Sequence, residues 1–301
     1  MTKFNVQQCP VCSGKEFFTF LTCTDFFVSQ EEFQIKQCSS CGLKITENVE
    51  DEKNIGRYYQ SEQYISHSNT SQGLINRIYH GVRKWMLGRK RKLVENITGL
   101  KSGQILDEGA GTGIFQNEMK RHGWQVTGTE KSNDARQFAK TEFNLGIFPS
   151  ENLFTLTENH FDVITLWHVL EHIQLLNENM EFFRRLLKEN GKLVIAVPNH
   201  DSYDARHYKQ FWAAWDVPRH IWHFTPRPMN RLAKNHGFTI TGIYAMSFDP
   251  FYVSLLSEKY KKSKVAFLKG FFFGKISWLN SVFKPGKCSS VIYVLEKELL
   301  Q

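Results

Sequence analysis

The 301-residue sequence has no long uncharged apolar run, and its first residues, MTKFNVQQCPVC, contain no apolar stretch. A signal peptide needs such a stretch near its start, and a membrane-spanning helix needs roughly 18 or more consecutive apolar residues. We therefore expect a cytoplasmic protein without a transmembrane segment.

Several catalytic motifs are also missing. The sequence contains no H-E-x-x-H, the helical histidine pair of hydrolytic zinc sites. It has neither the [D/N/S]-P-P-[Y/F] motif of enzymes that methylate base amino groups nor the Pro-Cys pair that supplies the nucleophile of cytosine C5 methylation. These absences argue against zinc-dependent hydrolysis and against methylation of nucleic-acid bases.

The composition, 41% hydrophobic and 23% charged, is that of an ordinary globular protein, and the length suits one large α/β domain with a small appendage. The net charge of +8 would suit a nucleic acid, an anionic substrate or a membrane surface, but we interpret it first as a solubility feature. The basic run RKRK at 89–92 follows apolar residues at helical spacing and indicates the polar side of an amphipathic helix.

Four of the six cysteines form two C-x-x-C pairs, CPVC and CSSC. Two intervening residues let both thiolates of a pair reach one tetrahedral zinc ion. A redox-active pair is the alternative, but such a pair normally occurs once, near a βαβ unit. We predict a closed structural zinc site in a zinc-ribbon-like module over residues 1–48, with the ligands Cys9, Cys12, Cys38 and Cys41.

From residue 99 onward, short apolar runs alternate with helical stretches. Strands are expected at QILDE, QVTGTE, FDVITL, GKLVIAVP, FTITGIYA and SVIYVLE. One expected helix has Leu176, Met180, Phe183 and Leu187 on a single face. This alternation predicts an α/β, doubly wound, mostly parallel sheet over residues 99–301, preceded by a linker and amphipathic lid helix over 49–98.

The turn LDEGAGTG follows the first of these strands. Gly109, Gly111 and Gly113 remove side chains where a backbone turns sharply toward a ligand, and the next helix offers amide donors. Glu130 ends the next strand, where an acid can accept both hydroxyls of an adenosine ribose. A dinucleotide fingerprint beginning at Gly109 would need glycine at position 114, but the chain has Ile114, which disfavours a dehydrogenase.

The segments ILDEGAGTG, GTEKS, FDVITLWHVLEH and RRLLKENGKLVIAVPN together resemble the class I S-adenosylmethionine-dependent methyltransferases over most of residues 100–200. The chain is most similar to an uncharacterised group with W-H-x-L-E-H, V-P-N and D-x-P-R-H-x-x-H-F segments and an N-terminal four-cysteine module. It resembles sugar C-methyltransferases more loosely, and ubiquinone-type O-methyltransferases only in the core motifs. The resemblance implies a Rossmann-like, seven-stranded sheet and S-adenosylmethionine as cofactor.

By this resemblance, the glycine turn would face the amino acid part of the cofactor, Glu130 the ribose, and the segment SEN at 150–152 the adenine. Glu108 is unusual, because the family often has an apolar residue there and a buried charge is costly unless paired or hydrated; we expect it to face the ligand. The full expected set of cofactor residues is Asp107, Glu108, Gly109, Ala110, Gly111, Gly113, Glu130, Lys131, Ser132, Glu151, Asn152, Leu166, Trp167, His168 and Tyr64.

Methyl transfer from a sulfonium is an in-line displacement, so the enzyme mainly positions the reactants and excludes water. A hydroxyl or carbon acid also needs a base. His168, Glu171 and His172 follow the strand FDVITL at its ligand-facing end and are the candidates, with His168 favoured. A purely structural role in capping or holding the loop stays open for Glu171 and His172.

The stretch FWAAWDVPRHIWHF at 211–224 concentrates aromatic and charged residues. We expect it to cover the acceptor, with its three tryptophans as an apolar wall, Arg219, His220 and His223 as polar contacts, and Asp216 paired with Arg219. The alternative is an aromatic core with satisfied histidines. A metal site is less favoured, because the spacing is not that of a helical zinc pair; its ligands would be His200, His207, His220 and His223.

Two further segments carry weaker signals. The resemblance suggests that Tyr64 and His67 approach the cofactor or acceptor, although tyrosines in linkers usually only pack. Residues 264–283 mix bulky apolar side chains with lysines. We favour a buried helix beside a sheet edge over membrane-surface contact for this segment.

The leading hypothesis is an S-adenosylmethionine-dependent methyltransferase acting on oxygen or carbon of a small quinone-, sugar- or other metabolite-like acceptor. One alternative is a nicotinamide-dependent oxidoreductase. The other is a nucleic-acid-binding protein that uses the zinc ribbon and the basic helix, with or without methylation, and a nucleic-acid partner is the less favoured expectation.

Overall fold

The computed structural model describes residues 3–59 and 74–298. The chain forms two compact units, each assembled from three stretches of chain. Unit 1 comprises Met1–Ser61, His168–Glu178 and Ala196–Tyr293, and unit 2 comprises Glu62–Trp167, Asn179–Ile195 and Val294–Gln301. The boundaries at residues 48 and 98 that the sequence suggests stay predictions.

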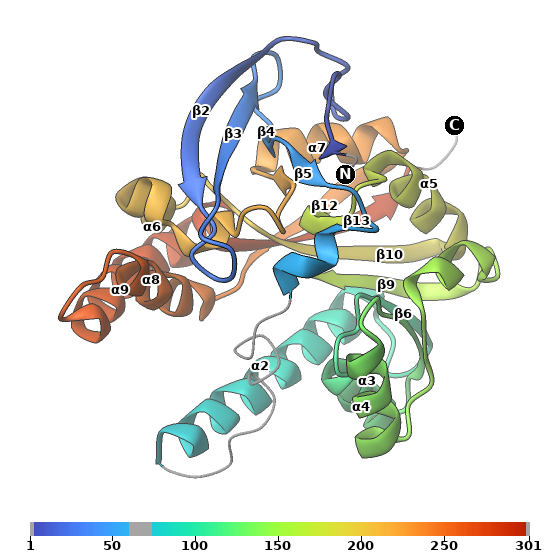
Figure 1. Cartoon of the computed structure of the whole chain (residues 1–301). Coiled ribbons are helices and arrows are strands. Elements are labelled where there is room, and N and C mark those ends of the chain that lie inside the picture. The colour runs from blue at the N-terminus through green and yellow to red at the C-terminus, as the bar shows by residue number, and fades with distance from the viewer. Residues whose placement is uncertain (1–2, 60–73, 299–301) are drawn as a thin grey trace. The chain divides into compact units, whose positions relative to one another are not determined.

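The strands of unit 2 are parallel: β6 pairs with β7 and β9, and β7 pairs with β8. The whole sheet has seven strands in the order β12-β13-β10-β9-β6-β7-β8 (Figure 1). Its strands are β6 (Gln104–Glu108), β7 (Gln125–Thr129), β8 (Ile147–Phe148), β9 (Phe161–Trp167), β10 (Leu187–Pro198), β12 (Phe238–Ala245) and β13 (Ser290–Lys297). The predicted Rossmann-like α/β fold with a mostly parallel, seven-stranded sheet is confirmed.

The central strands are buried along most of their length, as expected when helices cover both faces of a parallel sheet. The helices of this part of the chain are α2 (Leu74–Thr98), α3 (Ile114–Arg121), α4 (Asn133–Phe143) and α5 (Leu176–Leu186). One local prediction is wrong: Leu187 begins β10 rather than ending the helix. Leu187 is still fully buried. The apolar pattern therefore predicted its burial correctly, but assigned it to a helix instead of a strand.

Unit 1 contains an antiparallel sheet with the strand order β11-β4-β3-β2. Three of its strands come from the N-terminal region, namely β2 (Phe17–Thr24), β3 (Glu32–Cys38) and β4 (Lys44–Thr46). The fourth, β11 (Trp222–His223), belongs to the aromatic stretch and pairs with β4. A separate ladder joins β1 (Lys3–Phe4) to β5 (Val49–Glu50). The cysteine-containing region and the aromatic stretch are therefore parts of one folded body.

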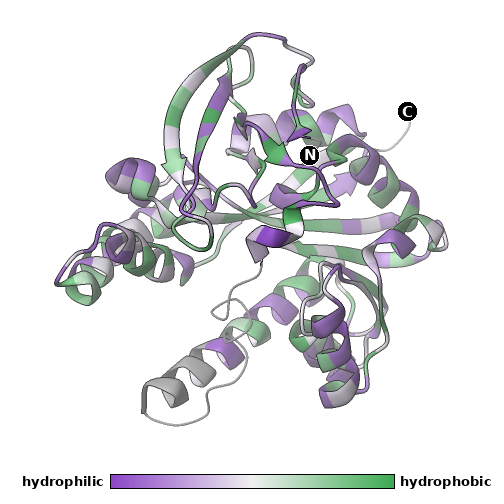
Figure 2. Ribbon diagram, viewed as in Figure 1, coloured by the Kyte–Doolittle hydropathy of each residue, from purple (hydrophilic) through white to green (hydrophobic). Residues whose placement is uncertain are grey.

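The remaining helices of unit 1 are α6 (Tyr203–Tyr208), α7 (Pro226–Asn235), α8 (Asp249–Tyr260) and α9 (Ala266–Phe283). The sequence-based preference for a buried helix over 264–283 is wrong. Phe267 is 70% exposed and Phe283 is 82% exposed, whereas the buried positions of α9 are glycines and serines. Figure 2 shows hydrophobic ribbon segments on this exposed helix.

Short 3-10 helices connect the longer elements: η1 (Ile55–Tyr59), η2 (Ser150–Thr155), η3 (Leu170–His172), η4 (Lys209–Phe211), η5 (Ala213–Trp215) and η6 (Pro285–Lys287). Within residues 3–59 and 74–298, no helix has the length and apolar content needed to cross a membrane.

Candidate functional site

The glycine turn between β6 and α3 has the backbone conformation that its sequence predicts. Gly109, Gly111 and Gly113 have φ values of 66°, 55° and 73°, a region that side chains rarely adopt. A Cβ atom at Gly111 would meet open space, whereas one at Gly113 would lie 3.0 Å from Ala139 and from Leu145. Gly113 therefore serves helix packing, and Gly111 leaves room beside the turn.

Two buried acids end β6 directly before this turn. Asp107 accepts a hydrogen bond from the Thr165 hydroxyl on β9 at 2.6 Å, and Glu108 accepts one from Thr129 on β7. Burial raises the pKa of each carboxyl to about 7, against the opposing effect of these hydrogen bonds. Glu108 is only 6% exposed, and the Thr129 hydroxyl on the neighbouring strand is its hydrogen-bond donor; that Glu108 faces the ligand stays a prediction.

Glu130 connects the end of β7 to the turn. Its carboxylate accepts hydrogen bonds from the backbone N–H of Gly111 and of Ser132, each at 2.8 Å. Each carboxylate oxygen has a second lone pair available for another donor. The acid expected at the ribose thus holds the glycine turn in place and keeps acceptor capacity.

Apart from His168, the other described residues of the expected cofactor set lie in unit 2, in the glycine turn, at the start of α4, in η2 and at the end of β9. Ala110 donates its N–H to Thr129 O at 2.9 Å within the turn, and Ser132 caps α4 by accepting from Ala135 N. Lys131 precedes that cap, while Glu151 and Asn152 lie in η2. Leu166 and Trp167 end β9, where Leu166 is fully buried. Tyr64 and His67 lie outside the described residues.

His168, the first residue after β9, is clamped between two acids. Its Nδ1 lies 3.4 Å from Glu171 Oε1, and its Nε2 lies 3.2 Å from Asp249 Oδ2. Burial disfavours the charged ring, but the two carboxylates outweigh it and raise the pKa of His168 to about 9. The residue has a φ of 60°, uncommon for a non-glycine residue. A ring held as a cation at neutral pH is poorly suited to accept a proton.

His172 has the opposite character. Burial, followed by the charge of His220, lowers the pKa of His172 to about 4, so its ring is neutral at pH 7. Its Nδ1 lies 2.9 Å from the carbonyl oxygen of Arg219 and 3.1 Å from the Tyr59 hydroxyl. Because a carbonyl only accepts, Nδ1 carries the proton and Nε2 keeps its lone pair. This ring can take up a proton.

Glu171 is fully buried, and neither of its carboxylate oxygens has a hydrogen-bond partner among the described residues. His168 lies near it, and the His220 Nε2 atom lies 3.9 Å from Oε1. The His220 Nδ1 atom lies 2.9 Å from Ala214 O, which orients the ring with Nε2 toward the acids. The carboxylate is thus surrounded by three histidine rings.

Glu171, His172 and His220 also offer one ligand atom each within 4.8 Å of one another. Backbone carbonyls orient both rings through Nδ1, an arrangement common around metal-bound histidines. The set is therefore chemically able either to hold a divalent cation or to move a proton. His220 joins this cluster rather than the other histidines of the alternative metal set, His200, His207 and His223.

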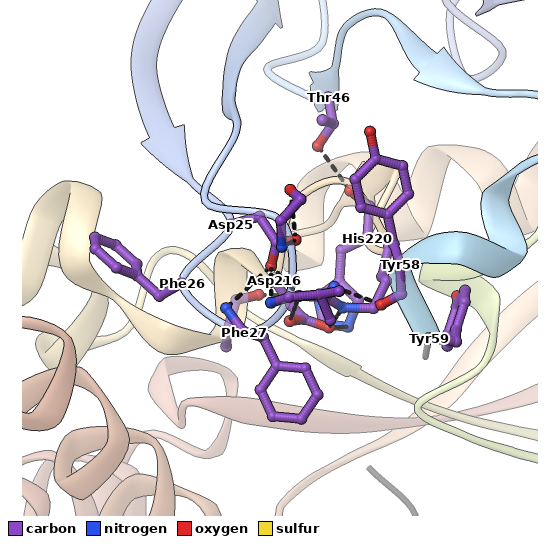
Figure 3. A network of polar contacts seen from close by, with 12 residues as sticks. Asp25, Phe26, Phe27, Thr46, Tyr58, Tyr59, Asp216 and His220 are labelled. Carbon is purple, nitrogen blue, oxygen red and sulfur yellow. Dashed lines mark hydrogen bonds and ion pairs between the residues drawn. The ribbon is translucent and has the colours of Figure 1, made fainter. Parts of the chain in front are cut away.

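Arg219 forms ion pairs with Asp25 and Asp216. Figure 3 shows both acids within one network of polar contacts. Its guanidinium donates to Asp216 at 2.7 and 3.0 Å, to Asp25 at 2.8 Å and to the Tyr58 carbonyl at 2.8 Å. The predicted Asp216 pair is confirmed, and Arg219 is only 2% exposed. Because its donors are bound to protein, the geometry favours a positioning role: Arg219 holds the backbone whose carbonyl orients His172.

The three tryptophans of the aromatic stretch are buried, and each indole N–H finds a partner inside unit 1. Trp212 donates to Asp204 at 2.7 Å, Trp215 to Lys209 O at 2.8 Å, and Trp222 to Ile173 O at 2.6 Å. The structure therefore matches the alternative in which these aromatics form core.

Three residues around the cluster were not expected from the sequence: Asp25, Tyr59 and Asp249. Asp249 begins α8 and contacts His168 from a distant part of the chain. Asp25 and Arg219 are 194 residues apart in sequence. No local motif surrounds any of the three, so the sequence around them does not identify them.

The two C-x-x-C pairs come together in unit 1. The Sγ atoms of Cys9 and Cys41 are 3.5 Å apart, and those of Cys12 and Cys38 are 3.4 Å apart. All four Sγ atoms lie within 4.8 Å of one another, and none forms a disulfide. Such a group has the donor chemistry of a tetrahedral thiolate site.

A family model described as a methyltransferase domain matches residues 82–242, more than half of the chain. A ubiquinone biosynthesis O-methyltransferase from Alkalilimnicola ehrlichii is 26% identical over 176 residues, 54% of this chain and 69% of that protein. One from Glaesserella parasuis is 32% identical over 117 residues, 35% of this chain and 49% of that protein. The chain thus spans about half the length of some of these relatives.

Two solved structures have the same fold. Phosphoethanolamine N-methyltransferase 2 from Haemonchus contortus, solved with S-adenosyl-L-methionine, gives a TM-score of 0.51 at 16% identity, over 94% of this chain and 69% of that chain. A putative S-adenosylmethionine-dependent methyltransferase from Listeria monocytogenes gives 0.50 at 13% identity, over 73% of this chain and 100% of that chain. These two structures show the fold, and the family match over residues 82–242 shows that this chain belongs to the methyltransferase domain family.

Proposed function

We propose that the protein transfers a methyl group from S-adenosylmethionine to an oxygen or carbon atom of a small-molecule acceptor. One observation carries this proposal: the turn at Gly111 opens onto free space, and the Glu130 carboxylate lies beside it with acceptor capacity left. This arrangement suits a ligand with ribose hydroxyls and a charged amino acid group.

The residues present fit this cofactor. Gly111 leaves room for the close approach of the ligand, and a side chain there would fill the space. The first turn of α3 lacks a side-chain cap, so its amide N–H groups can bind a carboxylate. Glu130 would accept the ribose hydroxyls. When bound, S-adenosylmethionine supplies an electrophilic methyl group on a sulfonium.

The proton on the acceptor would pass to His172. Its ring is neutral at pH 7, and its Nδ1 proton is fixed by the Arg219 carbonyl, which leaves Nε2 as the acceptor atom. Glu171 would stabilise the imidazolium that forms, because its buried carboxylate has no hydrogen bond among the described residues. His168 would position Glu171, and its positive charge would offset the cost of burying the Glu171 carboxylate. This assignment moves the base from His168 to His172.

The relatives' names support an O-methyl acceptor. They are ubiquinone biosynthesis O-methyltransferases, so we propose a hydroxyl on a small, quinone-like ring as the first acceptor class to screen, with sugars and other metabolites next. We also propose a structural zinc ion at the four clustered cysteines.

Isothermal titration of the full chain with S-adenosylhomocysteine and with NAD tests this function without knowledge of the acceptor. We expect micromolar binding of S-adenosylhomocysteine alone. NAD binding alone would instead support an oxidoreductase. Binding of neither ligand would contradict the proposal, and tight, steeply salt-dependent binding of a nucleic acid would then favour the third hypothesis.

A further inference from the structure

Helix α9 buries its small residues and exposes its large apolar ones. Its buried positions are Gly270, Gly274, Ser277 and Ser281, at spacings of four, three and four residues, so they lie on one face. Large apolar side chains occupy the opposite, exposed face. A helix that only completes a protein core places its large apolar residues inward.

The small face is a close-packing surface against α8. A Cβ atom at Gly270 would lie 2.6 Å from the Leu255 Cα atom, and one at Gly274 would lie 2.8 Å from the Phe251 Cα atom. The two helix backbones therefore approach closely, and this packing fixes which face of α9 points outward. Phe271 packs against Phe251, with ring centroids 5.5 Å apart, but is still 57% exposed.

The outward face is strongly apolar over the whole helix. The exposed fractions of its side chains are large: Phe267 70%, Leu268 69%, Phe271 57%, Phe272 59%, Leu279 44%, Val282 54% and Phe283 82%, and Val265 directly before the helix is 46% exposed. Contiguous exposed apolar surface of this kind marks an interaction site, whereas scattered single residues do not.

The segment of chain that contains α9 carries charge of a single sign. Residues 259–287 contain no aspartate or glutamate, and they contain lysines at 259, 261, 262, 264, 269, 275, 284 and 287. All of them are exposed except Lys287, which is partly buried and paired with Asp201. The methylene stems of such lysines can lie along an apolar surface while their ammonium groups reach anionic groups beside it.

We propose that the outward face of α9 binds the surface of a membrane that contains anionic phospholipids. Phenylalanine and leucine side chains would enter the boundary between headgroups and acyl chains, and the lysines would contact lipid phosphates. A second copy of the chain fits this face less well, because a symmetric contact would bring the same lysines together without an acid to pair them. The proposal stands independently of the methyl transfer proposed above.

Vesicle flotation of the full-length protein tests this proposal. We expect binding to vesicles of phosphatidylcholine with phosphatidylglycerol at least about tenfold tighter than to phosphatidylcholine alone, with the difference shrinking as salt rises. The variant Phe267→Ser/Phe272→Ser/Phe283→Ser should lose at least about tenfold in affinity for the anionic vesicles. A control variant, Phe18→Ser/Phe148→Ser, removes exposed phenylalanines of other elements and should bind as the wild type does.

A second variant, Lys264→Gln/Lys269→Gln/Lys275→Gln, should lose the preference for anionic vesicles and keep the fold, measured by circular dichroism. The proposal is overturned if the wild-type protein ignores anionic vesicles, or if the triple Phe variant binds them as well as the wild type does. It is also overturned if light scattering finds a dimer that the Phe variant abolishes while vesicles bind no protein, because a second copy would then cover this face.

Discussion

The glycine turn and the histidine cluster are built in opposite ways. In the turn, the polar partners are near one another in sequence: Glu130 binds the backbone of Gly111 and of Ser132. In the cluster, His172 meets Tyr59 from 113 residues away, and Arg219 meets Asp25 from 194 residues away. The geometry of the turn depends on local backbone, whereas the geometry of the cluster depends on the packing of distant segments of unit 1. Perturbing that packing should therefore affect the cluster and spare the turn.

The largest effect should come from the four cysteines. We expect about one zinc ion per chain, because a preformed closed thiolate site binds zinc strongly and folds its segment. Cys38→Ser should lose the metal and unfold the N-terminal strands, measured by metal analysis and hydrogen exchange.

The matched control for that variant is Cys23→Ser, since Cys23 is a buried free thiol outside the cluster. It should keep the metal. An equal loss of zinc in both variants, or wild-type protein without zinc, would contradict a structural zinc ion at the four clustered cysteines.

The substitution Arg219→Met should have the next largest effect, a loss of stability. It leaves two carboxylates, Asp25 and Asp216, without their cation in a buried place, which should lower the free energy of unfolding by about 3–5 kcal/mol. Urea denaturation measures this loss. Arg206→Met, which breaks an exposed pair with Asp201, should cost only about 0–1 kcal/mol.

The same two variants test whether the glycine turn is independent of the histidine cluster. Under conditions where Arg219→Met remains folded, its affinity for S-adenosylhomocysteine should stay within about twofold of the wild type, because the turn is built locally. A collapse of cofactor affinity in Arg219→Met would show that the turn depends on unit 1.

Gly111→Val should weaken S-adenosylhomocysteine binding by on the order of 100-fold, because the side chain fills the open space beside the turn. Gly99→Val is the control: Gly99 also has a positive φ, 70°, and open space around its Cβ position, but it lies outside the turn. Both variants carry similar backbone strain. Calorimetry should separate them, and equal affinities would remove the turn from the cofactor site.

The smallest effects are in the pH dependence of stability. The pKa of His172 is about 4 when folded and about 6.5 when unfolded, so the unfolded state binds more protons between these values. The contribution of His172 to stability should therefore fall as the pH drops from 6.5 to 4, by about 3 kcal/mol at most, while the raised pKa values of Asp107 and Glu108 act in the opposite direction. The pKa of His168 is about 9 when folded, above its unfolded value of about 6.5, so its protonated ring stabilises the folded state at low pH. This contribution to the free energy of unfolding should be lost as the pH rises from 6.5 to 9.

Denaturation of His172→Gln and His168→Gln across pH 4–9 measures these two contributions. The first variant should flatten the acid decline and leave the alkaline one, and the second should do the reverse. If both variants keep the acid decline unchanged, His172 is not the neutral ring of the cluster and loses its assignment as base.

The fold was predictable because it rests on repeated local patterns. Alternating apolar runs and helices identified the strands of the parallel sheet, and the glycine turn was identified by its own residues. The cluster was predicted only in part: His168, Glu171, His172 and His220 were named, but we now propose His172 rather than His168 as the base. The reason is electrostatic: Asp249 helps to keep His168 charged. Asp249 is distant in sequence and belongs to no local motif, so its effect on His168 could not be predicted.

The error at α9 has a different cause. Its large apolar residues suggested burial, but the four small residues Gly270, Gly274, Ser277 and Ser281 determine which face packs. A stripe of small residues at helical spacing is visible in the sequence and predicts a close helix contact. It leaves the bulky face outside.

Hydrogen exchange of the full chain with and without S-adenosylhomocysteine tests the central claim most directly, because it locates the ligand. We predict protection of the backbone of residues 109–117 and 129–133, with no protection there from NAD. Binding without protection of these residues would contradict the assignment of the glycine turn as the cofactor site.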